Sequence, residues 1–244
     1  DVLAPLISKS LVTTRGKSSD QVRYRMLETL RAYATEMLIA AGEHLVARDR
    51  HCSWCLAWLT SPLLDDLGLS TPAFELLQIE IENLRTAFDW SMARENSSDD
   101  CRIACRLYGY WWATGQFHEG RRRVLECLER GDQLNESERL DCHAAIGGLS
   151  TLHMGYDFVV DHCTQGVSLA KDRSRPLNAA ALSARAFVHA IRAASSPRHV
   201  DAEFAKLARR DIAEAQADAR SRGSDKWLAL VLAYAACVET TLDD

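Results

Sequence analysis

The chain has 244 residues, of which 47% are hydrophobic and 26% are charged, an ordinary balance for a folded globular protein. This composition argues against a largely disordered chain, and the formal charge of −5 gives no overall attraction to nucleic acid, although it leaves room for a local basic face. No apolar run approaches the roughly 18–20 residues that a membrane-spanning helix needs, and the first ten residues do not resemble a secretory leader, so we expect a cytoplasmic protein with no membrane partner.

The first forty residues predict two strands followed by a helix. Leu6–Val12 is typical of a strand, and the run Arg23–Leu38 changes its hydrophobic period from two to about 3.6, which indicates a strand that leads into an amphipathic helix. The polar segment Thr13–Asp20 between them suggests a hairpin. We expect the helix to cover Thr29–Ala41 and to end at Gly42 in a left-handed cap. These elements are too few for a complete domain, so the chain should begin inside one.

Residues 42–98 predict a helical connector. Cys52–Leu59 places its apolar side chains on one helix face, and a break is expected near Ser61 and Pro62. A further helix is predicted from apolar residues that recur at alternating spacings of three and four, the pattern of a helix that packs a narrow stripe against a neighbour: Phe74, Leu77, Ile81, Leu84 and Phe88. The polar run ENSSDD, which ends at Asp100, predicts a boundary between modules.

Residues 99–244 predict an array of tetratricopeptide-like helical hairpins, so the expected fold class is mainly α. The expected helix pairs are 101–114 with 119–129, 140–153 with 159–171, and 179–194 with 200–220, and residues 227–240 would open a fourth pair. Stacked hairpins form a concave surface that suits recognition better than chemistry. The last helix is more apolar than a terminal repeat should be, so we expect the array to be truncated at its C-terminal end.

Eight cysteines in a chain of this length are too sparse for a disulfide scaffold, so most should be reduced and buried. Cys52 and Cys55, joined with Cys101 and Cys105, could in principle supply four thiolates for zinc. A helical i, i+4 pair is an unusual half-site, however, and the flanks lack the turn glycines of a zinc knuckle. Core packing is the favoured interpretation, and we predict no metal and no cofactor.

Several motifs occur in order along residues 3–130. The chain has L-x-x-L-x-x-K-S-L-V from Leu3 to Val12, RYRMLETLRAYA from Arg23 to Ala34, G-E at Gly42–Glu43, R-H at Arg50–His51, E-x-x-N-L-R at Glu80–Arg85 and E-G-R at Glu119–Arg121. In this order they resemble the region that spans the end of the winged helix and the following tetratricopeptide-like repeats in LuxR/AfsR-type bacterial transcriptional regulators, which are members of the STAND class of signal transduction ATPases.

The resemblance implies a domain organisation. Residues 1–41 would be the C-terminal part of a winged-helix module, residues 42–98 a helical connector, and residues 99–244 the tetratricopeptide-like repeats. It also implies an upstream nucleotide-binding module in the same polypeptide, which would be a partner of this segment. In such proteins the winged helix is more often an internal hinge than a reader of DNA, so DNA would be contacted only indirectly, through another module.

Signals of enzymatic activity are weak. Gly16-Lys17-Ser18 matches the end of a phosphate-binding loop, but Leu11 stands where that motif requires its first glycine, and the tripeptide lies between two predicted strands. His153, His162 and Cys163 form a loose cluster in which no spacing proposes a nucleophile beside a base. We therefore predict no catalytic residue and no enzyme.

Two sets of residues are candidates for binding. The first is a partner or effector surface made of Tyr108, Trp111, Trp112, Arg121, Arg122 and Arg123; the second is a set of basic residues in the hairpin region that could contact nucleic acid, made of Lys9, Arg15, Lys17, Arg23 and Arg25. The alternatives are plain helix packing for the aromatic residues and a solvated face for the basic ones. Because adjacent helix residues lie about 100° apart, at least one of Trp111 and Trp112 should be part exposed.

These observations favour a non-catalytic sensor or protein-interaction segment of a multidomain ATP-dependent transcriptional regulator. We expect it to couple the binding of an unknown effector or protein partner to the nucleotide switch of the regulator. The alternative is a direct DNA-binding module that uses the basic hairpin and Arg121–Arg123.

Overall fold

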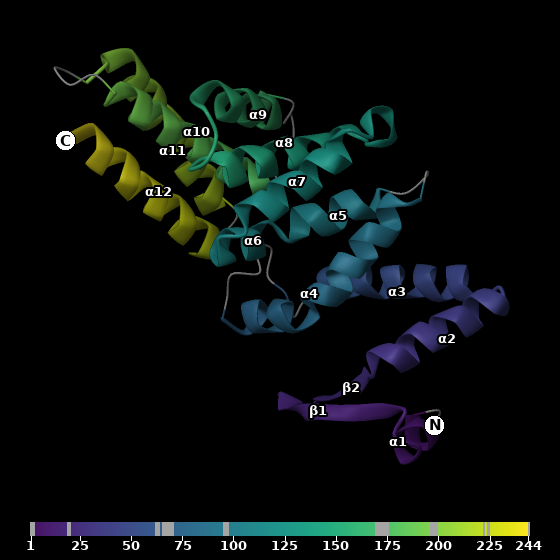
Figure 1. Ribbon diagram of the computed structural model, residues 1–244. Helices are drawn as coiled ribbons and strands as arrows, with labels where there is room; N and C mark the ends of the chain where they lie inside the picture. The colour runs from purple at the N-terminus through teal and green to yellow at the C-terminus, as the bar shows by residue number, and fades with distance from the viewer. Residues whose placement is uncertain are drawn as a thin grey trace. The chain divides into compact units, whose positions relative to one another are not determined.

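The computed structural model describes residues 3–18, 21–61, 64, 71–94, 98–168, 176–195, 200–221, 223 and 225–243. It divides into two compact units, which we call unit 1 (Asp1–His51) and unit 2 (Cys52–Asp244). The described residues are mainly helical, and their strands form a two-stranded sheet near the N-terminus (Figure 1). The predicted fold class, mainly α with a short β-hairpin ahead of a helical array, is confirmed. The predicted domain boundaries after residues 41 and 98 stay predictions.

Unit 1 contains a short helix, a β-hairpin and a longer helix. The elements are α1 (Leu3–Ser8), β1 (Val12–Ser18), β2 (Gln21–Met26) and α2 (Glu28–Ala40). The two strands pair antiparallel, with Val12 opposite Met26. The predicted hairpin and the helix that follows it are therefore confirmed.

The prediction of a strand over Leu6–Val12 is wrong, because most of that segment belongs to α1 or to the turn after it. Leu3, Leu6 and Ile7 have the spacing of one helix face, and Pro5 lies within the first turn, where its missing N–H costs little. The turn then passes through Ser10, which adopts a positive φ of 55°. The helical spacing of these apolar residues therefore outweighs the strand preference of the segment Leu6–Val12.

The prediction of a polar link over Thr13–Asp20 is also wrong, because β1 extends to Ser18. Thr13 and Thr14 are β-branched and suit an extended backbone. The hairpin is consequently tighter than the sequence suggested, and β2 begins at Gln21.

The end of α2 agrees with its predicted glycine cap. Gly42 has a φ of 72°, in the left-handed region. The Gly42 N–H donates to the carbonyl of Ile39, and the Glu43 N–H donates to the carbonyl of Leu38. This pair of hydrogen bonds is a Schellman motif, which satisfies carbonyl groups that the helix itself leaves free.

The helices of unit 2 follow one another with short links. They are α4 (Thr71–Met92), α5 (Asp99–Arg106), α6 (Tyr108–Thr114), α7 (Phe117–Leu128), α8 (Glu136–Ser150), α9 (Tyr156–Ser168), α10 (Pro176–Ala193), α11 (Ala202–Ser221) and α12 (Asp225–Asp243), with a 3₁₀ turn at Gly131–Gln133. A further helix, α3 (His44–Leu59), begins in unit 1 and ends in unit 2. The predicted helix pairs agree with these elements, except that the first helix of the first pair is broken at Leu107 into α5 and α6. The expected end of the 159–171 helix at Lys171 and the Pro62 part of the expected break lie outside the described residues.

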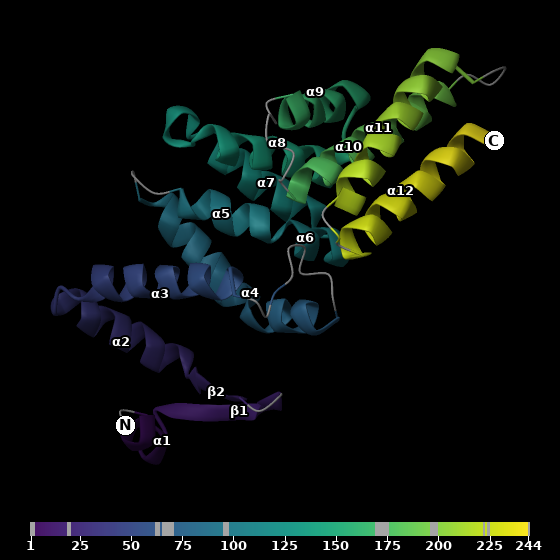
Figure 2. The same ribbon diagram turned by 180° about the vertical axis from the view of Figure 1, so that it is seen from behind.

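Successive hairpins of unit 2 pack on one another. Helix α8 packs against α9, α10 against α11, and α12 lies beside both α10 and α11 (Figures 1 and 2). Helix α10 also contacts α8 and α9, so it is the central helix of this part. Its core positions are mostly alanines, including Ala179, Ala180 and Ala181, and small side chains let several helices approach one axis closely.

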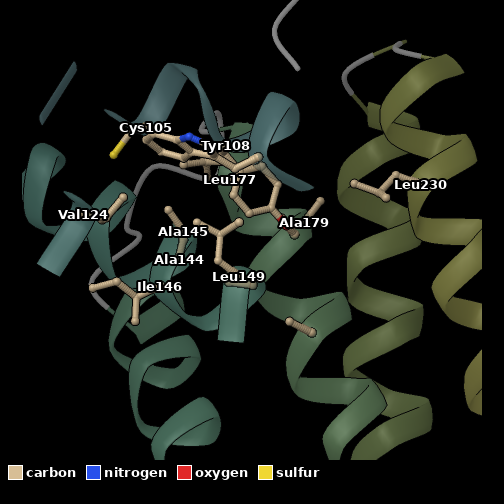
Figure 3. Packing of buried hydrophobic residues seen from close by; sticks show 14 of the residues in the cluster. Cys105, Tyr108, Val124, Ala144, Ala145, Ile146, Leu149, Leu177, Ala179 and Leu230 are labelled. Carbon is tan, nitrogen blue, oxygen red and sulfur yellow. The ribbon is translucent and has the colours of Figure 1, made fainter. Parts of the chain in front are cut away.

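The apolar core of unit 2 runs from α3 to α12. Figure 3 shows part of it, where Tyr108 of α6, Val124 of α7, and Ile146 and Leu149 of α8 gather around the same interior. In the described ranges, none of the helices combines the length and the apolar character that crossing a membrane would require.

Candidate functional site

The aromatic part of the predicted partner surface is mostly buried. Tyr108 and Trp111 are 2% and 0% exposed, so neither ring offers surface to a partner. Trp111 lies against Gly120 on α7 so closely that a Cβ added at Gly120 would stand 2.6 Å from Trp111 Cε3. Trp112 is the part-exposed member of the pair, and its Nε1 donates to the hydroxyl of Tyr234 on α12 over 3.4 Å. Trp112 is therefore the aromatic residue of this group that remains available to a partner.

The three arginines in the middle of α7, Arg121–Arg123, do not form a single basic face. Arg123 is buried, its Nη1 lies 2.8 Å from Asp89 Oδ1 and its guanidinium carbon stands 4.6 Å from the centre of the Phe88 ring. Arg122 is exposed and pairs with Glu126 one turn further along the helix. Arg121 is part exposed, although its Nη1 is buried without a hydrogen-bond partner among the described residues. Only Arg121 and Arg122 can contribute to a surface.

Two of the sequence motifs meet in an ionic clasp between α4 and α7. Arg85, the last residue of E-x-x-N-L-R, donates from Nε to Glu119 Oε1 over 2.8 Å, and Glu119 is the first residue of E-G-R. Arg123 donates to the same oxygen over 3.0 Å, and Arg85 also bonds to Gln116. We call this group, made of Arg85, Gln116, Glu119 and Arg123, the α4–α7 clasp.

The electrostatics of the α4–α7 clasp follow from these bonds. Burial alone would raise the pKa of Glu119, but the hydrogen bonds from Arg85 and Arg123 outweigh it, so the pKa of that carboxyl is lowered. The hydrogen bond with Glu119 likewise raises the pKa of Arg85. Within E-x-x-N-L-R, Asn83 Nδ2 donates to Glu80 Oε2 over 2.6 Å. The motifs therefore have a structural explanation, since their ionic side chains join α4 to α7.

The basic residues of the hairpin region are spread over several elements. Lys9 lies in the turn after α1 and is exposed, Arg25 on β2 is exposed, and Arg23 on β2 is part exposed. Backbone positions 15 and 23 are paired across the sheet. The side chains of Arg15 and Lys17 lie outside the described residues, so the structure tests only part of this candidate set.

Unit 1 also has an apolar hollow of about 510 Å³. It is lined by residues of α1, the hairpin and α2: Leu6, Leu11, Met26, Leu30, Tyr33, Ala34, Met37, Leu38, Ala41 and Glu43. Tyr33 and Met37 are 60% and 46% exposed, which is unusual for large apolar side chains that share one helix face. The sequence predicted this amphipathic stripe on α2 but did not predict that it would face solvent.

The four cysteines considered as possible zinc ligands lie in two separate places. Cys52 and Cys55 pack against α4, with their sulfurs 3.8 Å from the Ala87 carbonyl oxygen and 3.7 Å from that of Asn83. Burial raises the pKa of Cys55 to about 12. Cys101 and Cys105 instead meet Cys142 on α8, and the Sγ atoms of Cys101 and Cys142 are 3.3 Å apart. The structure thus does not bring Cys52 and Cys55 together with Cys101 and Cys105, the four cysteines considered from the sequence as possible zinc ligands.

Cys142 was missed as a neighbour of Cys101, although a signal was present. The two residues are 41 positions apart, close to the hairpin repeat of about forty residues, and equivalent positions of neighbouring repeats lie close together in a stacked array. Hydrogen bonds with Cys101 and Cys142, and then burial, raise the pKa of Cys105. In the same way the contact with Cys101, followed by burial, raises the pKa of Cys142.

A buried polar network joins α9, α10 and α11, and nothing in the sequence pattern predicted it. Arg185 on α10 donates to both carboxylate oxygens of Asp211 on α11, over 2.6 and 3.1 Å. His189 Nε2 lies 3.8 Å from the same carboxylate, and His189 Nδ1 lies 2.8 Å from the hydroxyl of Tyr156. Burial lowers the pKa of His189. Because Asp211 is fully buried and bound on both oxygens by arginine, the arrangement serves to hold helices together.

The loose cluster of His153, His162 and Cys163 is not a single site. The ring of His153 lies against Phe117, and His162 pairs with His143 on α8, with their Nδ1 atoms 3.0 Å apart. Burial lowers the pKa of both histidines of that pair, and the charge of His162 lowers that of His143 further. Cys163 is fully buried among the helices.

Comparison with known proteins agrees with the N-terminal part of this description. Residues 1–39 match the family model of the winged helix-turn-helix domain. The chain is also 33% identical over 123 residues to proteins of Mycobacterium bovis and of the strains CDC 1551 and H37Rv of Mycobacterium tuberculosis, which carry the provisional name of HTH-type transcriptional regulator. The aligned stretch covers 49% of this chain and 13% of each relative. No solved structure shows a significant similarity to the chain.

The similarity is therefore to a winged helix at the N-terminal end of this chain and to proteins that are named as transcriptional regulators. The relatives are named as regulators and not as enzymes. The chain spans about one eighth of the length of these relatives, so the activity and the partners of a whole regulator come to this chain only as proposals.

Proposed function

We propose that this chain is the non-catalytic sensor or protein-interaction segment of a multidomain transcriptional regulator. The observation that carries the proposal is a winged helix-turn-helix match at residues 1–39 on a chain whose described residues from α3 to α12 are mostly helical. Stacked hairpins present extended surfaces for partners, whereas the buried ion pair of Arg185 with Asp211 joins α10 to α11. The names of the mycobacterial relatives agree with a regulatory role.

Within this proposal the regulator is an ATP-dependent switch of the STAND class, and the hairpins are tetratricopeptide-like repeats of a LuxR/AfsR-type protein. The repeats contact a nucleotide-binding module of the same polypeptide in the resting state, and an effector or partner protein favours the arrangement in which that contact is released. The apolar hollow of unit 1 supports a role in a larger winged-helix module, because its large exposed side chains would be covered by further residues of such a module. In this setting the protein works in the cytoplasm.

The first test concerns the longer polypeptide that the reading frame of this segment encodes. We expect a phosphate-binding loop of the G-x-x-x-x-G-K-[ST] type upstream, and we expect removal of residues 99–244 to change the rate of nucleotide exchange several-fold. A reading frame without such a loop, or an exchange rate that does not depend on the hairpins, would contradict the coupling.

The second test addresses the alternative of direct DNA binding. Because Arg123 is buried and paired, the α7 arginines offer fewer surface cations than the sequence suggested, and Lys9 and Arg25 are exposed candidates of the hairpin region. A labelled duplex DNA is titrated with the protein at several salt concentrations, since phosphate contacts weaken steeply with salt. We expect weak binding that Lys9→Ala and Arg25→Ala leave unchanged. Tight, salt-sensitive binding that these substitutions weaken would favour the alternative.

A further inference from the structure

Three cysteine sulfurs converge at the contact between α5 and α8. Cys101 and Cys105 are one helical turn apart on α5, and Cys142 projects from α8. The three Sγ atoms all lie within 4.8 Å of one another, and those of Cys101 and Cys142 are 3.3 Å apart. The three side chains are 1%, 9% and 0% exposed in the order Cys101, Cys105, Cys142. We call this group the trithiol site.

The spacing of the trithiol site suits one central atom with three sulfur ligands. Sulfur ligands that lie about 2.3 Å from a central ion are separated from one another by roughly 3.8 Å in tetrahedral geometry. In the trithiol site the Sγ atoms of Cys101 and Cys142 are 3.3 Å apart, and the other two Sγ separations are at most 4.8 Å, so the site is close to this spacing. Small side-chain rotations would bring all three sulfurs onto one centre, because each cysteine has a single side-chain torsion that places its sulfur.

A cavity gives small molecules access to the trithiol site. Cys105 lines a cavity of about 440 Å³ together with residues that include Thr60, Arg102, Arg106 and Asp141. Thr60 and Arg102 are exposed, so the cavity reaches the surface. Cys105 is also the most exposed of the three cysteines, and Figure 3 shows its sulfur at the edge of the packed core. The cavity therefore offers a small uncharged molecule a route to Cys105, the member of the trithiol site that lines it.

Burial of the site decides which kind of ion fits it. Cys101, Cys105 and Cys142 belong to the hydrophobic core, where an uncompensated charge is strongly unfavourable. Three thiolates around a monovalent copper ion would leave two negative charges, and three around a divalent zinc ion would leave one. A trivalent ion that binds three thiolates leaves none. The apolar surroundings therefore favour a trivalent thiophilic ion over the common transition metals.

We propose that Cys101, Cys105 and Cys142 bind trivalent arsenic, supplied as arsenite, through three sulfur ligands. In this reaction each S–H bond and each As–OH bond breaks, an As–S bond forms, and the thiol proton leaves with the hydroxide as water. One As(OH)₃ and three thiols thus give one tris-thiolate complex and three waters, with no change in oxidation state. The product ties α5 to α8, two helices that the sequence separates by about one hairpin.

Binding is tested on the reduced whole chain by native mass spectrometry with increasing arsenite. We expect one arsenic per chain, seen as the mass of one arsenic atom less three hydrogen atoms. Cys142→Ala should weaken binding at least tenfold, because one of the three As–S bonds is lost. The matched control is Cys163→Ala, which truncates another fully buried cysteine outside the trithiol site and should bind as the unaltered chain does. Equal binding by the two variants would overturn the proposal.

A measurement on the unaltered chain keeps the test independent of how the variants fold. X-ray absorption at the arsenic edge should show three sulfur neighbours and no oxygen neighbour in the complex. Two sulfur neighbours with a remaining oxygen would overturn the proposal. Parallel titrations with zinc and with monovalent copper should give weaker binding, and tighter binding of either ion at these cysteines would overturn the charge argument. Both assays measure binding alone, so their outcomes do not depend on the proposed regulatory function.

Discussion

The two units of the chain treat their apolar side chains in opposite ways. Among the residues of unit 1 whose burial is described, Val12 alone is buried. On α2, the large apolar side chains of Tyr33, Met37 and Ile39 are largely exposed. In unit 2, large residues such as Trp111 and Trp227 are buried completely. An amphipathic helix such as α2 therefore does not by itself make a stable fold, since most of the stability of a helix in a protein comes from packing of its apolar face.

The difference between the two units is tested most directly by truncating one large aromatic side chain in each unit and comparing the loss of stability. Trp111→Ala should lower the free energy of unfolding of the chain by about 3–5 kcal/mol, because it empties a fully buried site. Tyr33→Ala should change it by less than about 0.5 kcal/mol, because that ring is mostly in solvent. Urea unfolding followed by circular dichroism gives both values. Similar losses for the two variants would show that unit 1 is packed as tightly as unit 2.

The buried network of unit 2 should be nearly as sensitive. Asp211→Ala leaves the buried Arg185 without its carboxylate partner and should cost about 3 kcal/mol or more in the same unfolding experiment. The matched control is Glu239→Ala, which breaks the exposed pair with Arg209 and should cost about 0–1 kcal/mol. A small effect of Asp211→Ala would mean that the network adds little to the packing of α10 against α11.

The close contact between α6 and α7 predicts an intermediate effect. Gly120→Ala adds a methyl group where the Trp111 ring already stands, so the chain should lose about 1–3 kcal/mol through overpacking, despite the better helix propensity of alanine. His118→Ala changes an exposed residue two positions away on the same helix and should be close to neutral. Thermal unfolding distinguishes them, and a stabilised Gly120→Ala variant would show that the helices can separate at this point.

In unit 1 the cap of α2 predicts a smaller, local effect. Gly42→Ala places a side chain at a φ of 72°, which costs about 1 kcal/mol for a residue other than glycine. Since unit 1 has little buried surface, the change should appear as faster hydrogen exchange in the last turn of α2, with little effect on the unfolding of unit 2. Unchanged exchange there would mean that the helix end is held by contacts other than its cap.

The smallest expected effect is a dependence of stability on pH. The pKa values of His143 and His162 are lowered in the folded chain, mainly by burial, so between about pH 7.5 and 5.5 the unfolded chain binds more protons than the folded one. Stability should therefore be fully present above the ordinary histidine pKa and should fall as the pH decreases. The variant His143→Gln with His162→Gln should show a weaker decline in melting temperature than the unaltered chain, and His118→Gln should show the same decline. A decline of equal size in all three would place its origin elsewhere.

The order of the helices could be predicted from the sequence because each helix carries its own periodic stripe. The helices from α4 to α12 follow the spacing of their apolar residues, and Gly42 and Gly115 both adopt the left-handed conformation that ends a helix. The strand assigned to Leu6–Val12 failed because short apolar runs fit both a strand and a helix. Local pattern therefore located the long elements well and the shortest element poorly.

The candidate surface could be predicted less well, because its residues are defined by contacts between distant segments. For Tyr108 and Trp111 the sequence allowed either a surface or helix packing, and the structure covers them with α8 and α7; Arg123 is paired with Asp89 of α4. The network of Arg185 with Asp211 joins residues 26 positions apart and has no local signature. Which charges are neutralised by a neighbour depends on how the helices pack, and local spacing along the sequence does not reveal that packing.

The crowded position of α10 constrains how the protein can change over evolutionary time. Outer helices such as α12 can exchange one side chain for another with little consequence on their exposed faces. On α10, a larger residue at Ala180 or Ala181 would have to be matched at the same moment by a smaller one on an adjoining helix. Related helical arrays should accordingly differ in correlated sets of substitutions at the buried positions of the helix that corresponds to α10. The exposed faces of their outer helices should vary independently of one another.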